Sequence, residues 1–169
     1  MSDNAQVQQW FAAVDTDRSG RISVTELQEA LLLGNLQFSL AVCAQMIRLH
    51  DRSSTNSLDM QDFMALHKFL EEMNQSFQMH DQDCSGSLNA NETHSALTSA
   101  GFNLEPPAFA EMCRAFDPER KGQISYAPYI AMTLFLRCAA NAFQAFDSSK
   151  MGRVNLDFSQ FIYAASNCR

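Results

Sequence analysis

Apolar side chains recur every three to four residues in short stretches of the chain, and each stretch runs into a polar segment that begins with an aspartate. The first stretch places Val7, Trp10, Phe11 and Val14 on one face of a helix. This is the spacing of an amphipathic helix that packs against a core. Four later stretches follow the same pattern, so the sequence predicts an all-α protein whose helices are separated by acidic loops.

The acidic segments form an internal repeat with an aspartate at position 1, Gly or Asn at position 6 and an aliphatic residue at position 8. The starting residues are Asp15, Asp51, Asp81, Asp117 and Asp147, and the eighth positions hold Ile22, Leu58, Leu88, Ile124 and Val154. A sharp turn at position 6 needs positive φ, which Gly adopts freely and Asn, here Asn56, tolerates. The aliphatic residues are expected to form short β pairing between neighbouring loops.

A helix before and after a loop of twelve residues is the EF-hand arrangement. The repeat therefore predicts five EF-hands in one domain over residues 1–169, with loops at 15–26, 51–62, 81–92, 117–128 and 147–158. The starts lie 36, 30, 36 and 30 residues apart. Each 30-residue interval leaves room for a single helix shared by two hands, near residues 60–80 and 127–146. About eight helices result.

A calcium loop needs side-chain oxygens at positions 1, 3 and 5, a backbone carbonyl at position 7 and a bidentate glutamate at position 12. Two loops supply the full set. The first offers Asp15, Asp17, Ser19, the carbonyl of Arg21 and Glu26, and the third offers Asp81, Asp83, Ser85, the carbonyl of Ser87 and Glu92. In the third loop, Asn89 stands at position 9, where a water would be oriented. We expect two Ca²⁺ sites.

The second loop is a poorer match. Ser53 and Thr55 replace carboxylates, and Asp62 at position 12 is one methylene shorter than glutamate. The sequence leaves weak or Mg²⁺-like binding open for this loop.

The fourth and fifth loops lack essential ligands. The fourth has Lys121 at position 5 and Pro128 at position 12. The fifth has Met151 and Phe158 at these positions, and a loop longer by two residues brings only Gln160 to its end. We expect neither loop to bind an ion and both to serve as scaffold.

Composition narrows the function classes. The formal net charge is −7 and the pI is near 4.9, which suits cation binding and disfavours nucleic acid as a partner. The five cysteines are widely spaced and the N-terminus is polar, so a reducing, cytoplasmic setting without a signal peptide is expected. No nucleophile elbow, phosphate-binding loop or His-Glu-x-x-His helix occurs, and an enzyme is not expected.

The five repeats, the shared helices and the 36/30 spacing resemble the penta-EF-hand family. The complete first loop, from Asp15 to Glu26, is similar to the branch that contains the apoptosis-linked calcium adaptor and peflin. The resemblance implies that the first and third hands hold the calcium and that the unpaired fifth hand pairs with its counterpart in another subunit, giving a homodimer or heterodimer. It also implies protein or peptide partners with Pro-rich or apolar segments, and at most peripheral, Ca²⁺-dependent membrane association.

Three functions remain open on this basis. In the first, the protein is a calcium sensor and adaptor, in which Glu26 and Glu92 move the helices that follow them and expose an apolar surface. In the second, it is a noncatalytic regulatory subunit of a calpain-like protease, which the complete first loop does not favour. In the third, it is a passive calcium buffer, which would bind the ion without exposing apolar surface.

Overall fold

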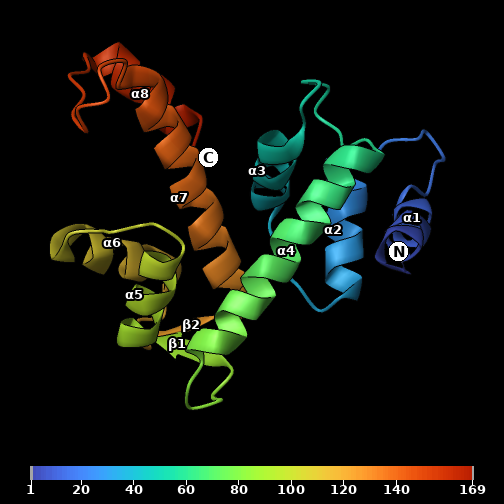
Figure 1. The fold of residues 1–169 in the computed structure, drawn as a ribbon, viewed down its shortest axis with the longest axis horizontal. Helices are drawn as coiled ribbons and strands as arrows, with labels where there is room; N and C mark the ends of the chain where they lie inside the picture. The colour runs from blue at the N-terminus through green and yellow to red at the C-terminus, as the bar shows by residue number, and fades with distance from the viewer. Residues whose placement is uncertain (1, 169) are drawn as a thin grey trace. The chain divides into compact units, whose positions relative to one another are not determined.

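The computed structural model describes residues 2–168, and this part of the chain contains eight helices and one two-stranded antiparallel sheet (Figure 1). The elements are α1 Ser2–Val14, α2 Val24–Leu33, α3 Leu40–His50, α4 Met60–His80, β1 Ser87–Asn89, α5 Ala90–Ser99, α6 Pro106–Phe116, β2 Gln123–Ser125, α7 Tyr126–Phe146 and α8 Phe158–Ser166. The all-α prediction is confirmed. So are the two shared helices, which are α4 and α7, each of 21 residues.

The chain forms two compact units, residues 1–76 and residues 77–169. The first unit contains α1, α2, α3 and most of α4. Its core is closed by an antiparallel bridge between the first two loops, in which the Ile22 and Leu58 backbones exchange N–H···O bonds of 2.8 and 2.9 Å. Both side chains are fully buried, and Phe11 meets Phe63 edge to face beside them. The predicted pairing of loops one and two is confirmed.

The second unit is built in the same way around the third and fourth loops. Strand β1 pairs with β2 so that Leu88 lies opposite Ile124. In α7, which follows β2, Tyr129 and Ile130 are fully buried, and the ring of Phe77 lies 5.7 Å from that of Tyr129. The position-8 residues therefore link the loops in pairs and cover the core of each unit.

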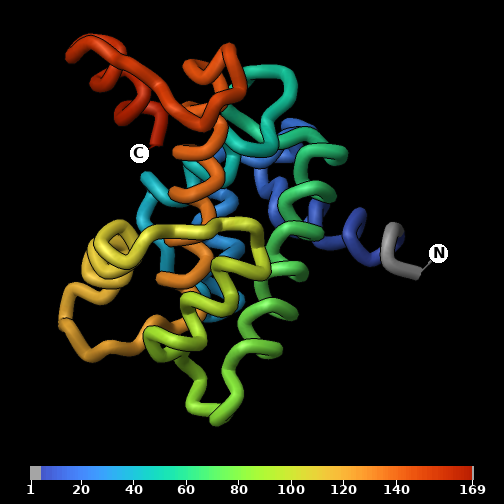
Figure 2. The backbone as a smooth tube through the Cα atoms, turned by 60° about the vertical axis from the view of Figure 1, so that its left-hand side comes forward, coloured from blue at the N-terminus to red at the C-terminus, as the bar shows by residue number. Residues whose placement is uncertain are grey.

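The fifth hand differs from the other four. Among the described residues its position-8 residue, Val154, belongs to no strand or bridge. Helix α8 begins after the N-cap Asp157, whose side chain accepts the Gln160 N–H while Gln160 bonds back to the Asp157 N–H. In the first and third hands the N-cap stands at position 9, so this loop is two residues longer. Figure 2 shows α8 beyond the end of α7, where the chain approaches its C-terminus.

No helix in the described part of the chain is both long enough and apolar enough to cross a lipid bilayer.

Candidate metal centres

The first loop gathers three carboxylates into one centre. One oxygen from each of Asp15, Asp17 and Glu26 lies within 4.8 Å of the others. Calcium–oxygen distances are about 2.3–2.6 Å, so two ligands on opposite sides of one ion lie roughly 4.6–5.2 Å apart. The three oxygens therefore fit a common Ca²⁺, and their hard, anionic character suits it.

Hydrogen bonds within the loop orient the remaining predicted ligands toward this centre. The Asp15 carboxylate accepts the N–H groups of Ser19 at 2.9 Å and Gly20 at 2.8 Å. The Ser19 hydroxyl donates to the Arg21 carbonyl at 2.9 Å, so the oxygens of positions 5 and 7 lie side by side. The structure thus brings together all five residues that the sequence singled out in this loop.

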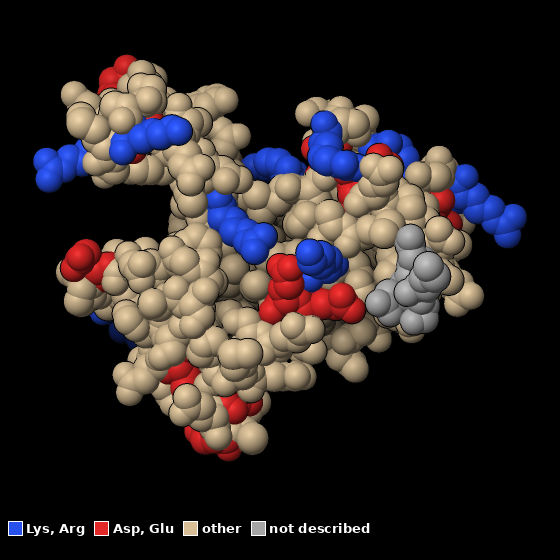
Figure 3. Space-filling view, viewed as in Figure 1, with Lys and Arg blue, Asp and Glu red and all other residues tan. Residues whose placement is uncertain are grey.

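The third loop repeats this geometry in the second unit. Oxygens of Asp81, Asp83 and Glu92 lie within 4.8 Å of one another. The Ser85 hydroxyl donates to the Ser87 carbonyl at 2.8 Å, as Ser19 does to Arg21. Figure 3 shows acidic side chains gathered at the bottom of the view, where Figure 1 places the loop between α4 and β1. Within residues 2–168, these two loops are the places where three such ligand groups converge.

The glutamate at position 12 has a second role that the sequence analysis did not assign. Glu26 is the third residue of α2, and its Oε2 accepts the N–H of the N-cap Ser23 at 2.9 Å, while Oε1 accepts the Thr16 N–H at 3.0 Å. These hydrogen bonds, that from the Ser23 backbone most strongly, lower the pKa of Glu26 to about 2. The carboxylate is therefore ionised at neutral pH and available to a cation.

Glu92 occupies the same place at the start of α5. Its Oε2 accepts the N–H of Asn89 at 2.9 Å, and its Oε1 accepts that of Gln82 at 3.1 Å. The Asn89 side chain accepts the Glu92 N–H and so serves as the helix N-cap, which differs from the water-orienting role expected for it. The sequence does carry the signal, because Ser-x-x-Glu and Asn-x-x-Glu before an apolar run are capping-box patterns.

The turns of all five loops share one backbone conformation. Position 6 has positive φ in each, including 57° at Asn56, as predicted. Position 4 also has positive φ, between 53° and 57°, although no glycine stands there: the residues are Arg18, Ser54, Cys84, Arg120 and Lys150. Two left-handed residues around position 5 allow the loop to fold its oxygens inward.

Asn56→Ala is expected to lower the free energy of unfolding of the first unit by about 1 kcal/mol, since a left-handed conformation costs most L-residues roughly 1–2 kcal/mol and costs asparagine less. Urea unfolding in EDTA, followed by the fluorescence of the single tryptophan Trp10, measures this change. Asn56→Gly is the control and should lie within about 0.5 kcal/mol of wild type. An alanine variant as stable as the glycine variant would contradict the argument.

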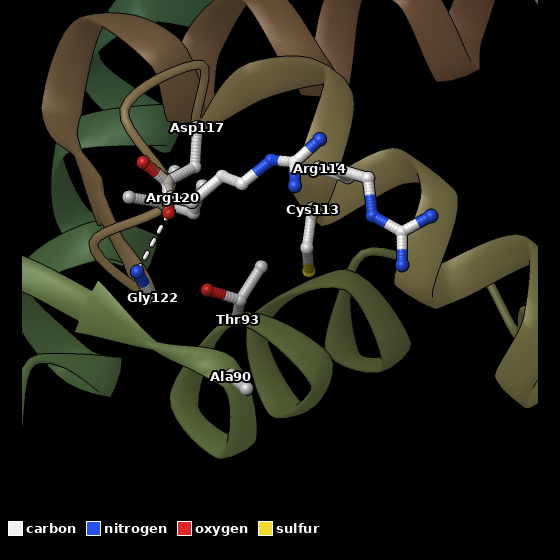
Figure 4. A pocket seen from close by; sticks show the side chains of 8 residues that line it. Ala90, Thr93, Cys113, Arg114, Asp117, Arg120 and Gly122 are labelled. Atoms are coloured by element: carbon white, nitrogen blue, oxygen red, sulfur yellow. Dashed lines mark hydrogen bonds between the residues drawn. The ribbon is translucent and has the colours of Figure 1, made fainter.

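In the other three loops, the acidic side chains bond to basic side chains or to backbone N–H groups. In the second, Arg52 lies 2.9 Å from Asp62 at position 12. In the fourth, Lys121 forms an ion pair with Glu119. Asp117 of this loop accepts the Gly122 N–H at 2.6 Å, the bond drawn in Figure 4. In the fifth, Asp147 accepts the N–H groups of Met151 and Gly152.

Each unit also contains a pocket next to an EF-hand helix. In the first, a pocket of about 440 Å³ lies between α1 and α2, where Trp10 and Leu33 line it together with Glu26 itself. In the second, a pocket of about 330 Å³ is lined by α5, α6 and the fourth loop. Figure 4 shows the Cys113 sulfur and the Thr93 side chain directed into it. Burial raises the pKa of the Cys113 thiol, which keeps it protonated.

Comparison with known proteins agrees with this architecture. Residues 7–32 match the family description "EF hand", and residues 70–134 match "EF-hand domain pair". The chain is 32% identical to peflin of Danio rerio over 96% of its own length and 61% of that protein. It is 30% identical to sorcin of Homo sapiens over 90% of its own length and 78% of that protein.

A solved structure of a homolog of programmed cell death 6 protein from Leishmania major superposes with a TM-score of 0.71 at 32% identity, covering 96% of this chain and 94% of that one. Four EF-hand loops pair with one another and a fifth follows them. Together with this arrangement, the relatives place the chain in the penta-EF-hand family of calcium-binding proteins. The chain spans 55–61% of the length of the peflins it matches.

Proposed function

We propose that this protein is a calcium sensor and adaptor that binds two Ca²⁺ ions, one in the first loop and one in the third, and then recruits partner proteins through apolar surface. The ligands would be the side chains of Asp15, Asp17, Ser19 and Glu26 with the Arg21 carbonyl, and the side chains of Asp81, Asp83, Ser85 and Glu92 with the Ser87 carbonyl. Each bound ion would bring a charge of +2 that these oxygens share. The helices that begin beside Glu26 and Glu92, α2 and α5, would move in response.

The placement of Glu26 carries this proposal. Its carboxylate caps α2, reaches the metal centre and lines the pocket between α1 and α2. Binding of Ca²⁺ by both oxygens of Glu26 would tie the first turn of α2 to the Asp15 centre. Because Glu26 also lines a pocket that contains Trp10, ion binding and exposure of apolar surface would be coupled through this one residue.

Charge and side-chain chemistry indicate the kind of partner. Two calcium ions add +4 to the formal charge of −7 and leave −3, which weakens repulsion of other acidic proteins. The first pocket joins the aromatic ring of Trp10 to aliphatic groups such as Leu33, a lining suited to apolar or Pro-rich segments. Membrane association would be peripheral and Ca²⁺-dependent.

The fifth hand supports pairing with a second copy of the chain. Within residues 2–168 its loop forms no strand or bridge with another loop, unlike the other four, and α8 has no buried residue. Phe158, Phe161, Ile162 and Tyr163 are 78%, 56%, 45% and 67% exposed. Such a contiguous apolar face marks an interaction surface, and a hand that pairs with its own copy closes a two-fold dimer.

Calorimetric titration of the wild-type chain with CaCl₂, with an apolar-surface dye followed in parallel, tests the proposed function. Two ions per chain and a rise in dye fluorescence that follows their uptake are expected. MgCl₂ at the same concentration is the control and should leave the dye signal unchanged. Calcium uptake without a dye response would make the protein a buffer, and uptake of fewer or more than two ions would contradict the assignment of sites.

A further inference from the structure

The side chain of Arg21 crosses from the first loop to the second. Its Nε donates to the Ser57 hydroxyl at 2.7 Å, and its Nη2 donates to the Ser53 hydroxyl at 3.1 Å and to the Ser57 carbonyl at 3.0 Å. The Thr55 hydroxyl also accepts from Nη2. One guanidinium is thus surrounded by four oxygens of a loop that lies more than thirty residues further along the chain.

These acceptors are the metal-binding positions of the second loop. Ser53 is its position 3, Thr55 its position 5, and the Ser57 carbonyl its position 7. In the first loop, the corresponding groups are those of Asp17, Ser19 and the Arg21 carbonyl. The guanidinium therefore lies where an ion would lie. Position 12 is engaged by a second arginine, since Asp62, with a side chain only 1% exposed, lies 2.9 Å from Arg52 Nε.

The chemistry of the second loop suits an arginine better than a metal. Hydroxyl and carbonyl oxygens are neutral acceptors, and a guanidinium offers five N–H donors in a fixed plane. A divalent ion in the same place would lack carboxylates at positions 3 and 5 and would be held only weakly, because EF-hand affinity depends on the number of charged ligands. Ser53 and Thr55 are thus matched to a monovalent organic cation.

We propose that Arg21 is a built-in cation for the second EF-hand, which occupies the ion position of that loop and excludes Ca²⁺ and Mg²⁺ from it. The weak Mg²⁺ binding that the sequence left open does not then occur in the wild-type protein. The backbone of Arg21 faces the first centre while its side chain holds the second, so this one residue fixes the first unit at a single ion. The claim that the first unit holds a single ion rests on the proposed function, because it requires Ca²⁺ in the first loop. The occupancy of the second loop by the guanidinium does not.

Removing the guanidinium should open the second loop to ions. Arg21→Met keeps an unbranched apolar stem and the backbone carbonyl, but it leaves the oxygens of Ser53, Thr55 and Ser57 without the guanidinium. We expect the variant to gain a third, weak site with a Kd on the order of 1 mM, the range of the weakest EF-hand sites. The sites of loops one and three should remain.

Arg153 provides a matched control. It also stands at position 7 of its loop, in the fifth hand, but it is exposed and its side chain makes no hydrogen bond within the described part of the chain. Arg153→Met removes the same charge from an equivalent position. It should leave the second loop as it is in the wild type.

The experiment uses the full ¹⁵N-labelled chain with two equivalents of CaCl₂, titrated with MgCl₂ into the millimolar range. Amide signals of residues 51–62 should shift in Arg21→Met and stay in place in wild type and in Arg153→Met. In the wild type alone, the Arg21 Nε–H signal should exchange with water at least tenfold more slowly than that of Arg153, which requires no variant to fold.

Each outcome decides the proposal. A Mg²⁺-dependent shift of the second-loop signals in the wild type, an Arg21 Nε–H that exchanges as fast as that of Arg153, or a folded Arg21→Met variant that gains no ion would each overturn it. A protected Arg21 in a chain whose first and third loops failed to bind Ca²⁺ would refute the proposed function and leave this inference standing.

Discussion

Replacing both Glu26 and Glu92 with glutamine is expected to abolish calcium binding at micromolar concentrations together with the dye response. Each glutamine offers one neutral carbonyl oxygen where the glutamate offers two anionic ones. Even the outer-shell partners of a metal are worth roughly 10–100-fold in affinity, so we expect the loss at each site to be about 100-fold or more. Calorimetry of the double variant against the wild type measures it.

Glutamine is chosen because it preserves the helix start. A glutamine at the third helical position can bond back to the N-cap N–H as glutamate does, so α2 and α5 should still begin at Val24 and Ala90. Circular dichroism of the metal-free variant should match that of the wild type. The control, Glu29→Gln with Glu71→Gln, removes two exposed carboxylates from α2 and α4 and should bind two ions. Micromolar binding that survived in the Glu26/Glu92 variant would show that other residues hold the metal.

Phe161→Asp with Tyr163→Asp on α8 is expected to convert the proposed dimer to a monomer. Both side chains are more than half exposed in the chain by itself, so the substitutions cost little in the isolated fold. In a dimer they would place four unpaired carboxylates in an apolar interface, each at a cost of several kcal/mol. A total of about 4 kcal/mol already raises the dissociation constant roughly 1000-fold. Sedimentation velocity at micromolar protein measures the change.

Leu32→Asp with Leu33→Asp on α2 is the matched control, because these side chains are 54% and 88% exposed and add the same charge outside the fifth hand. This variant should remain dimeric. A wild-type chain that is monomeric at these concentrations would show that the α8 surface does not pair with its own copy, and would favour a different chain as the partner, as in a regulatory subunit. A dimeric α8 variant would move the interface elsewhere.

The sequence by itself determined the features that depend on neighbouring residues. The ligands of one EF-hand lie within twelve consecutive positions, so a single pass along the chain finds both the complete loops and the incomplete ones. Helices α4 and α7 followed from spacing alone, because eighteen residues between two loops leave room for one helix. Asn56 was recognised as left-handed because it stands at position 6, where the other four loops have glycine, and because asparagine tolerates that conformation.

The tertiary structure decided the features that depend on segments distant in the sequence. Spacing left the fifth loop at either twelve or fourteen residues, and the Asp157–Gln160 cap selects the longer form. Only the pairing of the first two loops brings Arg21 to Ser53 and Ser57, and nothing local to Arg21 reveals whether its side chain meets solvent or another loop. The physical reason is that a loop's ligands are set by local backbone geometry, whereas a side chain's partners are set by which elements pack together.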